Sequence, residues 1–190
     1  MDVVGRVLVR TAAFVVLSLA ASAAARAQTV LGDVAGGYSA LSASTGGMPL
    51  GWFVSVSRNL TENLSIAGEV TGNYQWASSD FTDVTSTRKE HTFLAGPRLL
   101  LTGSDKESVF AHLLIGAATA TVSSTGTFGR TSVTTAATDT VICFEPGLGV
   151  DLDFNEATSL RVEVNYRSLT RSGTVGEFQF VAGVVHRFLR

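Results

Sequence analysis

The chain has 190 residues, of which 45% are hydrophobic and only 16% are charged, and its mean hydropathy is +0.29. This length suits one domain together with a processed segment. The low charge fraction, with nearly balanced signs, excludes an intrinsically disordered chain and a basic nucleic-acid-binding protein. A single cysteine excludes a disulfide scaffold and a cysteine-based zinc site. The sequence is hydrophobic for a soluble domain, yet it contains no apolar stretch long enough for a convincing membrane helix.

Residues 1–27 have the features of a secretory signal peptide. Arg6 and Arg10 give a basic start, an apolar stretch follows, and Ala25 and Ala27 are small residues at the positions that signal peptidase reads. The apolar stretch is shorter than the roughly 20 residues needed to span a bilayer. We therefore expect an exported protein whose mature domain covers residues 28–190.

The rest of the sequence alternates between apolar and other residues in eight segments, which predicts β-strands at residues 33–41, 51–58, 64–75, 91–101, 108–119, 141–153, 159–167 and 178–188. Each segment is close to the roughly 9–11 residues that a tilted transmembrane strand requires. Short connections follow the second, fourth and sixth segments. Longer Gly-, Ser- and Thr-rich loops, including residues 120–139, follow the first, third, fifth and seventh. This spacing predicts an all-β, eight-stranded antiparallel up-and-down barrel with all tight turns at one end.

One face of every predicted strand is apolar and free of Asp, Glu, Lys and Arg, and the charged residues lie on the other face. A soluble periplasmic or secreted barrel that binds an apolar ligand turns the apolar face inward, whereas a membrane barrel turns it outward. Aromatic residues favour the membrane barrel, since seven of them mark the apolar face at the long-loop end, as an interfacial girdle does: Tyr38, Trp52, Tyr74, Phe93, Phe144, Tyr166 and Phe178.

Short motifs agree with this interpretation: Gly37-Tyr38-Ser39, Gly51-Trp52, Gly96-Pro97-Arg98 and Arg187-Phe188. Together with the strand pattern, these motifs make nearly the whole mature chain resemble the small outer-membrane β-barrel family of OmpA type. The resemblance implies a porin-like transmembrane β-barrel in a Gram-negative-type outer membrane, in contact with lipid and inserted by the barrel-assembly machinery. Family members commonly end on the aromatic residue that this machinery reads, whereas Leu189 and Arg190 follow Phe188 here, which predicts less efficient assembly. We expect the barrel alone, without a peptidoglycan-binding domain.

Charges inside an eight-stranded barrel need partners, because its interior is just wide enough for side chains to fill it. Aligning the apolar residues of neighbouring strands predicts four facing pairs: Glu69 with Arg98, Arg98 with His112, Asp151 with Arg161, and Glu145 with Arg167. We therefore predict an ion-pair network that fills the lumen, formed by Glu69, Arg98, His112, Glu145, Asp151, Arg161, Glu163 and Arg167. The resemblance also implies weak ion conduction through rearrangement of such pairs, and lumen packing alone is the favoured alternative.

No motif indicates a catalytic, cofactor-binding or metal site, so we expect neither an enzyme nor a cofactor. Some small barrels are lipid-modifying enzymes with a histidine near the rim, and His91 is the only histidine so placed, but no Ser or carboxylate motif accompanies it. Three functions stay open: a structural or surface-interaction protein of the outer membrane, a soluble barrel that binds an apolar ligand, and, less favoured, a rim enzyme. The sequence names no partner for the loops, where specific function is expected, and it predicts no nucleic-acid partner.

Overall fold

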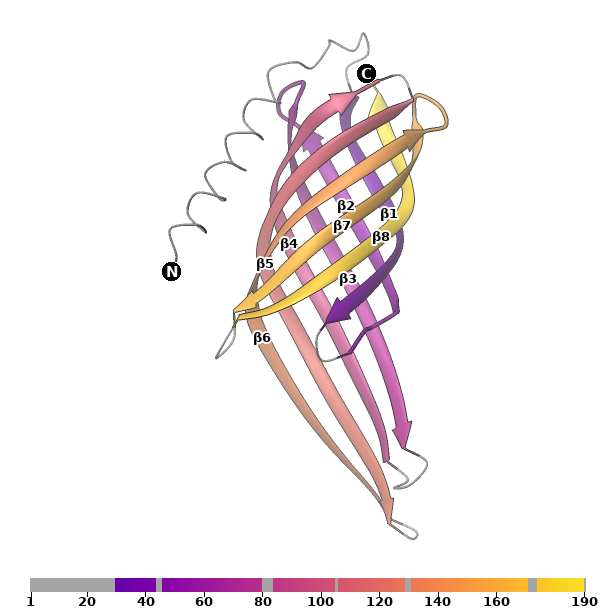
Figure 1. Ribbon diagram of the computed structural model, residues 1–190, viewed down its shortest axis with the longest axis vertical. Helices are drawn as coiled ribbons and strands as arrows, with labels where there is room; N and C mark the ends of the chain where they lie inside the picture. Colours follow the sequence, from indigo (N-terminus) through magenta and orange to yellow (C-terminus); the bar gives the residue numbers. More distant parts are fainter. Residues whose placement is uncertain are drawn as a thin grey trace, which may run out of the picture.

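The computed structural model describes residues 30–43, 46–79, 84–104, 106–128, 131–170 and 174–189. Their eight antiparallel strands form the predicted up-and-down barrel, closed by pairing of the first strand with the last (Figure 1). The strands are β1 (Val30–Ala43), β2 (Leu50–Asn59), β3 (Leu64–Ser79), β4 (Val84–Gly103), β5 (Glu107–Phe128), β6 (Thr131–Asp153), β7 (Thr158–Thr170) and β8 (Thr174–Leu189). No helix among these residues is both long and apolar enough to cross a membrane. The predicted signal peptide, residues 1–27, lies outside the described residues.

Three tight turns gather at one end of the barrel, as predicted. Backbone hydrogen bonds close them, from Leu60 N to Leu64 O at 2.8 Å, from Ser104 N to Glu107 O at 2.7 Å, and from Phe154 N to Thr158 O at 3.0 Å. We call this the tight-turn end and the opposite end the long-loop end.

Two regions predicted as loops, residues 76–90 and 120–139, are instead largely strand. β3 to β6 continue past the long-loop end as a four-stranded extension (Figure 1). We call residues 75–79, 84–88, 122–128 and 131–141 of these strands the protruding sheet. Threonine hydroxyls pair across its base and along it, for example Thr121 with Thr138 at 3.1 Å and Thr125 with Thr134 at 2.9 Å. Neither face of this sheet is covered, so its strands show no alternation of apolar and polar residues. The β-branched threonines favour the strand conformation without it.

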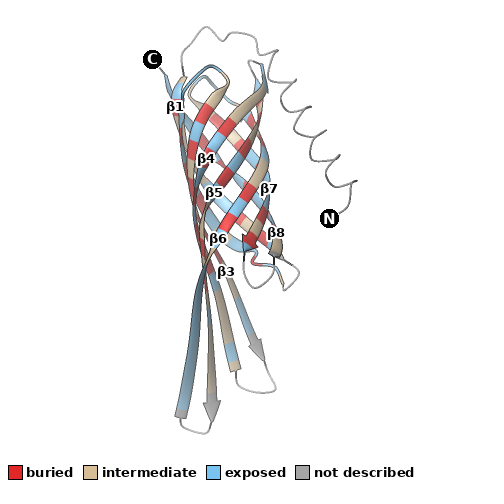
Figure 2. Ribbon diagram, turned by 90° about the vertical axis from the view of Figure 1, so that its left-hand side faces the viewer, coloured by how far each residue is buried: buried red, intermediate tan, exposed pale blue. Residues whose placement is uncertain are grey.

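Burial alternates along each strand of the barrel (Figure 2). The charge-free face points outward, where Val56, Phe93 and Ile115 are 56%, 59% and 58% exposed. The charged face points inward, where Arg161 and Arg167 are at most 1% exposed. This orientation is that of a membrane barrel and the reverse of what the alternative of a soluble barrel with an apolar interior requires.

Apolar side chains share the lumen with the charged ones. They form two buried clusters, one of Ala67, Leu94, Leu114, Ala118, Cys143 and Leu169 and the other of Ala35, Phe53, Val181 and Val185. Glycines on nearby strands make room for the large inward-pointing rings. A Cβ at Gly183 would lie 2.7 Å from the ring of Phe53, and one at Gly149 would lie 2.2 Å from Cζ of Phe110.

Candidate functional site

Six charged side chains meet in the lumen near the tight-turn end, and we call them the turn-side cluster: Asp33, Arg98, Asp151, Asp153, Arg161 and Arg187. Arg161 of β7 donates two hydrogen bonds to Asp151 of β6, from Nε at 2.7 Å and from Nη2 at 2.9 Å. Its Nη1 lies 3.3 Å from Oδ1 of Asp33 on β1, and Nη1 of Arg98 on β4 contacts the same carboxylate at 3.2 Å. The cluster therefore connects strands that are not neighbours in the sheet.

Phe110 of β5 lies between two of these guanidinium groups. Cζ of Arg98 and Cζ of Arg161 are each 4.8 Å from the centroid of its ring. A cation–π contact contributes roughly 0.5–2 kcal/mol, more when water is excluded. The ring therefore helps to hold both guanidinium groups in position while they pair with carboxylates.

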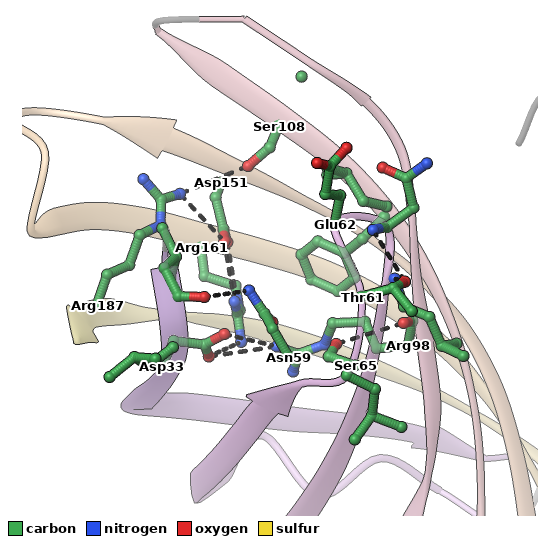
Figure 3. Close-up of a pocket in the computed structure, with 18 residues that line it drawn as sticks. Asp33, Asn59, Thr61, Glu62, Ser65, Arg98, Ser108, Asp151, Arg161 and Arg187 are labelled. Atoms are coloured by element: carbon green, nitrogen blue, oxygen red, sulfur yellow. Dashed lines mark hydrogen bonds and ion pairs between the residues drawn. The ribbon is translucent and has the colours of Figure 1, made fainter. Parts of the chain in front are cut away.

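A cavity of about 410 Å³ opens beside this cluster, at the tight-turn end of the lumen (Figure 3). Asn59 and Ser65 line it together with Arg98, Arg161 and Arg187. All three of these guanidinium groups pair with aspartates, including Arg187 with Asp153 at 2.7 Å. The cavity therefore presents charge that is already compensated, which does not favour an anionic ligand.

A second group of ion pairs fills the lumen nearer the long-loop end, and we call it the loop-side cluster: Arg88, Glu90, Glu145, Arg167 and Glu177. Nε of Arg167 on β7 lies 2.6 Å from Oε2 of Glu145 on β6, and its Nη1 reaches Glu90 on β4 at 3.3 Å. Arg88 bridges Glu90 at 3.5 Å and Glu177 of β8 at 3.2 Å. These bonds connect β4, β6, β7 and β8 across the lumen, at the base of the protruding sheet, to which Arg88 also belongs.

Between the two clusters, the hydrogen bonding of several buried side chains is incomplete. Glu69 is 3% exposed, has no ion pair in the described part of the chain, and its Oε1 has no hydrogen-bond partner. In the described part of the chain, both ring nitrogens of His112 and Oδ1 of Asn165 also lack hydrogen-bond partners, as do Nε of Arg98, Oε1 of Glu145 and Oε2 of Glu177 in the two clusters. Buried polar atoms are normally hydrogen-bonded, so incomplete bonding of this kind extends along the lumen.

Two of the predicted charge pairs, both between β6 and β7, are present in the structure. Asp151 lies opposite Arg161, and the same register brings Glu145 to Arg167. Arg98 also lies opposite His112, past an irregularity between Leu100 and Thr102, but two basic side chains cannot form an ion pair, so this neighbour adds no partner to Arg98.

The predicted pairing of Glu69 with Arg98 is wrong. Phe93 lies beside Val70 and not beside Tyr74, so Glu69 faces Leu94 and Arg98 faces Ser65. Apolar residues recur at every second position in both strands, so a shift by an even number of residues leaves the faces matched.

Sequence reasoning missed six members of the two clusters. Asp33, Asp153 and Arg187 lie on the charged face but received no partner, and Arg88, Glu90 and Glu177 were assigned to loops. A usable signal was present on β4, since Arg88 and Glu90 continue the inward positions of Thr92 and Leu94. The described residues contain no group of three or more His, Cys, Asp or Glu side chains that suits a metal ion.

All seven aromatic residues predicted for the girdle lie on the outer face of the barrel. Tyr74 is half-buried, and the other six are 40–59% exposed. Tyr38 pairs with Trp52 across β1 and β2, and Tyr166 packs edge-on against Phe178 with ring centroids 5.3 Å apart. The hydroxyl of Tyr38 donates a hydrogen bond to the carbonyl of Pro49.

His91 belongs to the same outer surface. Its Nε2 lies 3.2 Å from the hydroxyl of Tyr74, which also accepts a hydrogen bond from Nε1 of Trp52 at 3.2 Å. In the described part of the chain, neither a serine hydroxyl nor a carboxylate contacts this imidazole, so the arrangement lacks the parts of a nucleophilic catalytic site.

Comparison with known proteins gives the family. The family model of the outer membrane protein beta-barrel domain matches residues 11–188. Among solved structures, Ail, the attachment invasion locus protein of Yersinia pestis, has a TM-score of 0.60 at 14% identity, covering 83% of this chain and 97% of its own. Neisserial surface protein A has a TM-score of 0.56 at 13% identity, covering 83% of this chain and 96% of its own.

A second structure of Ail, in complex with the heparin analogue sucrose octasulfate, has a TM-score of 0.59 at 14% identity and covers 83% of this chain and 99% of its own. At these identities the likeness shows a shared fold. No curated protein matches the chain. The match over most of its length shows that the chain belongs to the outer membrane protein beta-barrel domain family, and its place is the outer membrane.

Proposed function

We propose that this protein is a non-enzymatic surface-interaction protein, in which the barrel is the anchor and the protruding sheet makes the contact. The observation that carries the proposal is the continuation of β3 to β6 beyond the long-loop end of the barrel. Outer-membrane barrels have short periplasmic turns and long extracellular connections, so the protruding sheet would stand on the cell surface.

The chemistry of the protruding sheet favours a protein partner. Among its described residues, Arg88 is the only basic one, and its guanidinium is engaged by Glu90 and Glu177. Ail was solved with a heparin analogue, but the described residues of this sheet offer little positive charge for a sulfated polysaccharide. Val122 and Val133, 44% and 55% exposed, and the threonine hydroxyls offer apolar contact and hydrogen bonding instead.

A strand edge adds to this surface. Within the described residues, the β6–β7 ladder begins at Ile142 and Thr170, so the backbone of residues 133–138 of β6 lies beyond it. Such an edge presents backbone donors and acceptors to which an extended segment of another protein can add. The names of the attachment protein Ail and of Neisserial surface protein A agree with a role at the surface.

We further propose that the aromatic girdle anchors the barrel at the level of the lipid headgroups and that the lumen ion pairs serve to close the barrel. The turn-side and loop-side clusters cross the interior at two levels, so we expect no open pore. Insertion by the barrel-assembly machinery is proposed as for the family.

Shortening the protruding sheet tests the proposal. Ser123 faces Ala136 in the β5–β6 ladder, so residues 124–135 can be replaced by Asn-Gly, which favours a two-residue hairpin turn. We expect cells displaying this variant to lose attachment to epithelial monolayers and to immobilised matrix proteins, with an unchanged amount of folded barrel on unboiled gels. The matched control, Thr121→Ser with Thr138→Ser, keeps the hydroxyl pair and should attach normally. Equal attachment by the shortened variant and the full chain would overturn the proposal.

A further inference from the structure

One sector of the outer face, at the long-loop end of β2 to β4, gathers polar aromatic and cationic side chains. We call Trp52, Tyr74, Trp76, Lys89 and His91 the rim cluster. Both tryptophans of the sequence belong to it. Lys89 lies opposite Tyr74 in the β3–β4 ladder, and Trp76 stacks on Tyr74 with ring centroids 6.0 Å apart and an interplanar angle of 18°.

Hydrogen bonds and a glycine hold this cluster together. Nε1 of Trp52 donates to the hydroxyl of Tyr74, and that hydroxyl is bonded to Nε2 of His91, each at 3.2 Å. A Cβ at Gly72 would lie 2.7 Å from Nε1 of Trp52 and 3.0 Å from the hydroxyl of Tyr74, so only a residue without a side chain lets the two rings meet above it. The rings are therefore fixed in place by packing, and they form a preformed surface.

Other donors of the rim cluster have no partner among the described residues. In the described part of the chain, nothing bonds the ammonium of Lys89, Nδ1 of His91 or Nε1 of Trp76. Trp76 is 57% exposed, and Lys89 is exposed too. Lys89 and His91 are also the only described basic side chains that point outward at the long-loop end. At the long-loop end, the basic side chains on the described part of the outer face thus lie where the polar aromatic rings gather.

We propose that the rim cluster binds the phosphorylated sugar headgroup of an outer-leaflet lipid. The stacked rings of Tyr74 and Trp76 give a flat face against which a sugar ring can pack, and the ammonium of Lys89 with the imidazole of His91 meets the phosphate. The cluster lies where the outer face passes from apolar strand into polar sheet, and its Trp52 pairs with Tyr38 of β1. This is the depth that we assign to the lipid headgroups. The rim cluster meets the protruding sheet at Trp76, but lipid binding there is a different role from the surface contact proposed for the sheet.

Because Trp52 and Trp76 are the only tryptophans, the fluorescence of the whole protein reports on this site. The full chain is placed in phosphatidylcholine nanodiscs that contain increasing fractions of a bis-phosphorylated diglucosamine lipid. The comparison arms are the same lipid without phosphates, and free glucosamine 1-phosphate in solution. We expect a saturable change in emission with the phosphorylated lipid alone.

Lys89→Gln should weaken the apparent affinity about fivefold, because a basic residue near an anionic lipid surface contributes about 1 kcal/mol and 1.4 kcal/mol corresponds to tenfold. The matched control is Arg58→Gln, which removes an exposed cation near the tight-turn end and should leave the titration unchanged. An equal response to the lipid without phosphates, or an equal loss in both variants, would overturn the proposal. Saturation by free glucosamine 1-phosphate would also overturn it, since the site would then not recognise a lipid.

Discussion

Replacing Arg161 with methionine probes how far the lumen ion pairs stabilise the barrel. Arg161 is 1% exposed and donates two charged hydrogen bonds to Asp151, at 2.7 and 2.9 Å. Its Nη1 also lies 3.3 Å from Asp33, and its Cζ lies 4.8 Å from the centroid of the Phe110 ring. Methionine fills much of the same volume and keeps a contact with the ring, so Arg161→Met removes mainly the charge and the hydrogen bonds.

Removing one partner of a buried ion pair costs about 3–5 kcal/mol, because the other charge is left buried without compensation. We therefore expect Arg161→Met to lower the free energy of unfolding by about this amount, and Asp151→Leu to lower it by a similar amount. The double variant should lose at least about 2 kcal/mol less than the two single losses added together, since neither charge of the pair then remains.

Urea unfolding in lipid vesicles, followed by the mobility of unboiled samples on SDS gels, measures all three variants against the unaltered protein. Arg98 still contacts Asp33 in each of them, so the cycle isolates the bonds between Arg161 and Asp151. Additive losses, or a loss below about 1 kcal/mol for Arg161→Met, would refute the view that these bonds close the lumen.

Three further predictions concern the lumen, its packing and the export segment. In planar bilayers we expect no ion conduction by the unaltered protein or by Arg98→Ala at low or high salt, and regular channel steps in either would show that the lumen opens. Gly149→Ala should destabilise the barrel by about 1–3 kcal/mol in the same urea assay, because its Cβ would lie 2.2 Å from Phe110. The control Gly36→Ala should be tolerated, since its Cβ meets nothing closer than 3.5 Å. Equal destabilisation by the two substitutions would contradict the packing described for Phe110. The intact mass of the exported protein should correspond to a chain that begins at Gln28, and retention of residues 1–27 would disprove the predicted signal peptide.

The barrel could be predicted from the sequence because the membrane imposes a simple rule on its strands. Lipid requires an apolar outer face, so charges such as Glu145 and Arg161 can occur only at inward positions, and a period of two results. Register was predictable where a tight turn joins the strands, as with Leu152 and Leu160 across the turn at residues 154–157. For β3 and β4 the sequence predicted a long loop at residues 76–90, which fixes no register, so the alignment of Tyr74 with Phe93 failed.

The protruding sheet was not predictable by the same means. Above the membrane neither face of β5 and β6 is buried, so Thr121 and Thr138 follow no hydrophobic alternation and their strand-forming tendency was the only signal. Part of the loop-side cluster was missed for the same reason, because Glu90, which contacts Arg167 in addition to the predicted Glu145, was assigned to a loop. The rim cluster depends on which rings meet across strands, and the pairing of Tyr74 with Lys89 becomes visible only once the β3–β4 register is known.

The central claim is that the barrel serves as an anchor and that the protruding sheet makes the contact with other surfaces. The most direct measurement compares the attachment of cells that display equal amounts of folded protein in three forms: the full chain, the chain with residues 124–135 replaced by Asn-Gly, and Arg161→Met. We predict that the shortened sheet abolishes attachment, whereas Arg161→Met, which acts only inside the barrel, attaches as well as the full chain. Attachment that survives shortening of the sheet, or that is lost with Arg161→Met at equal folded amounts, would contradict this account.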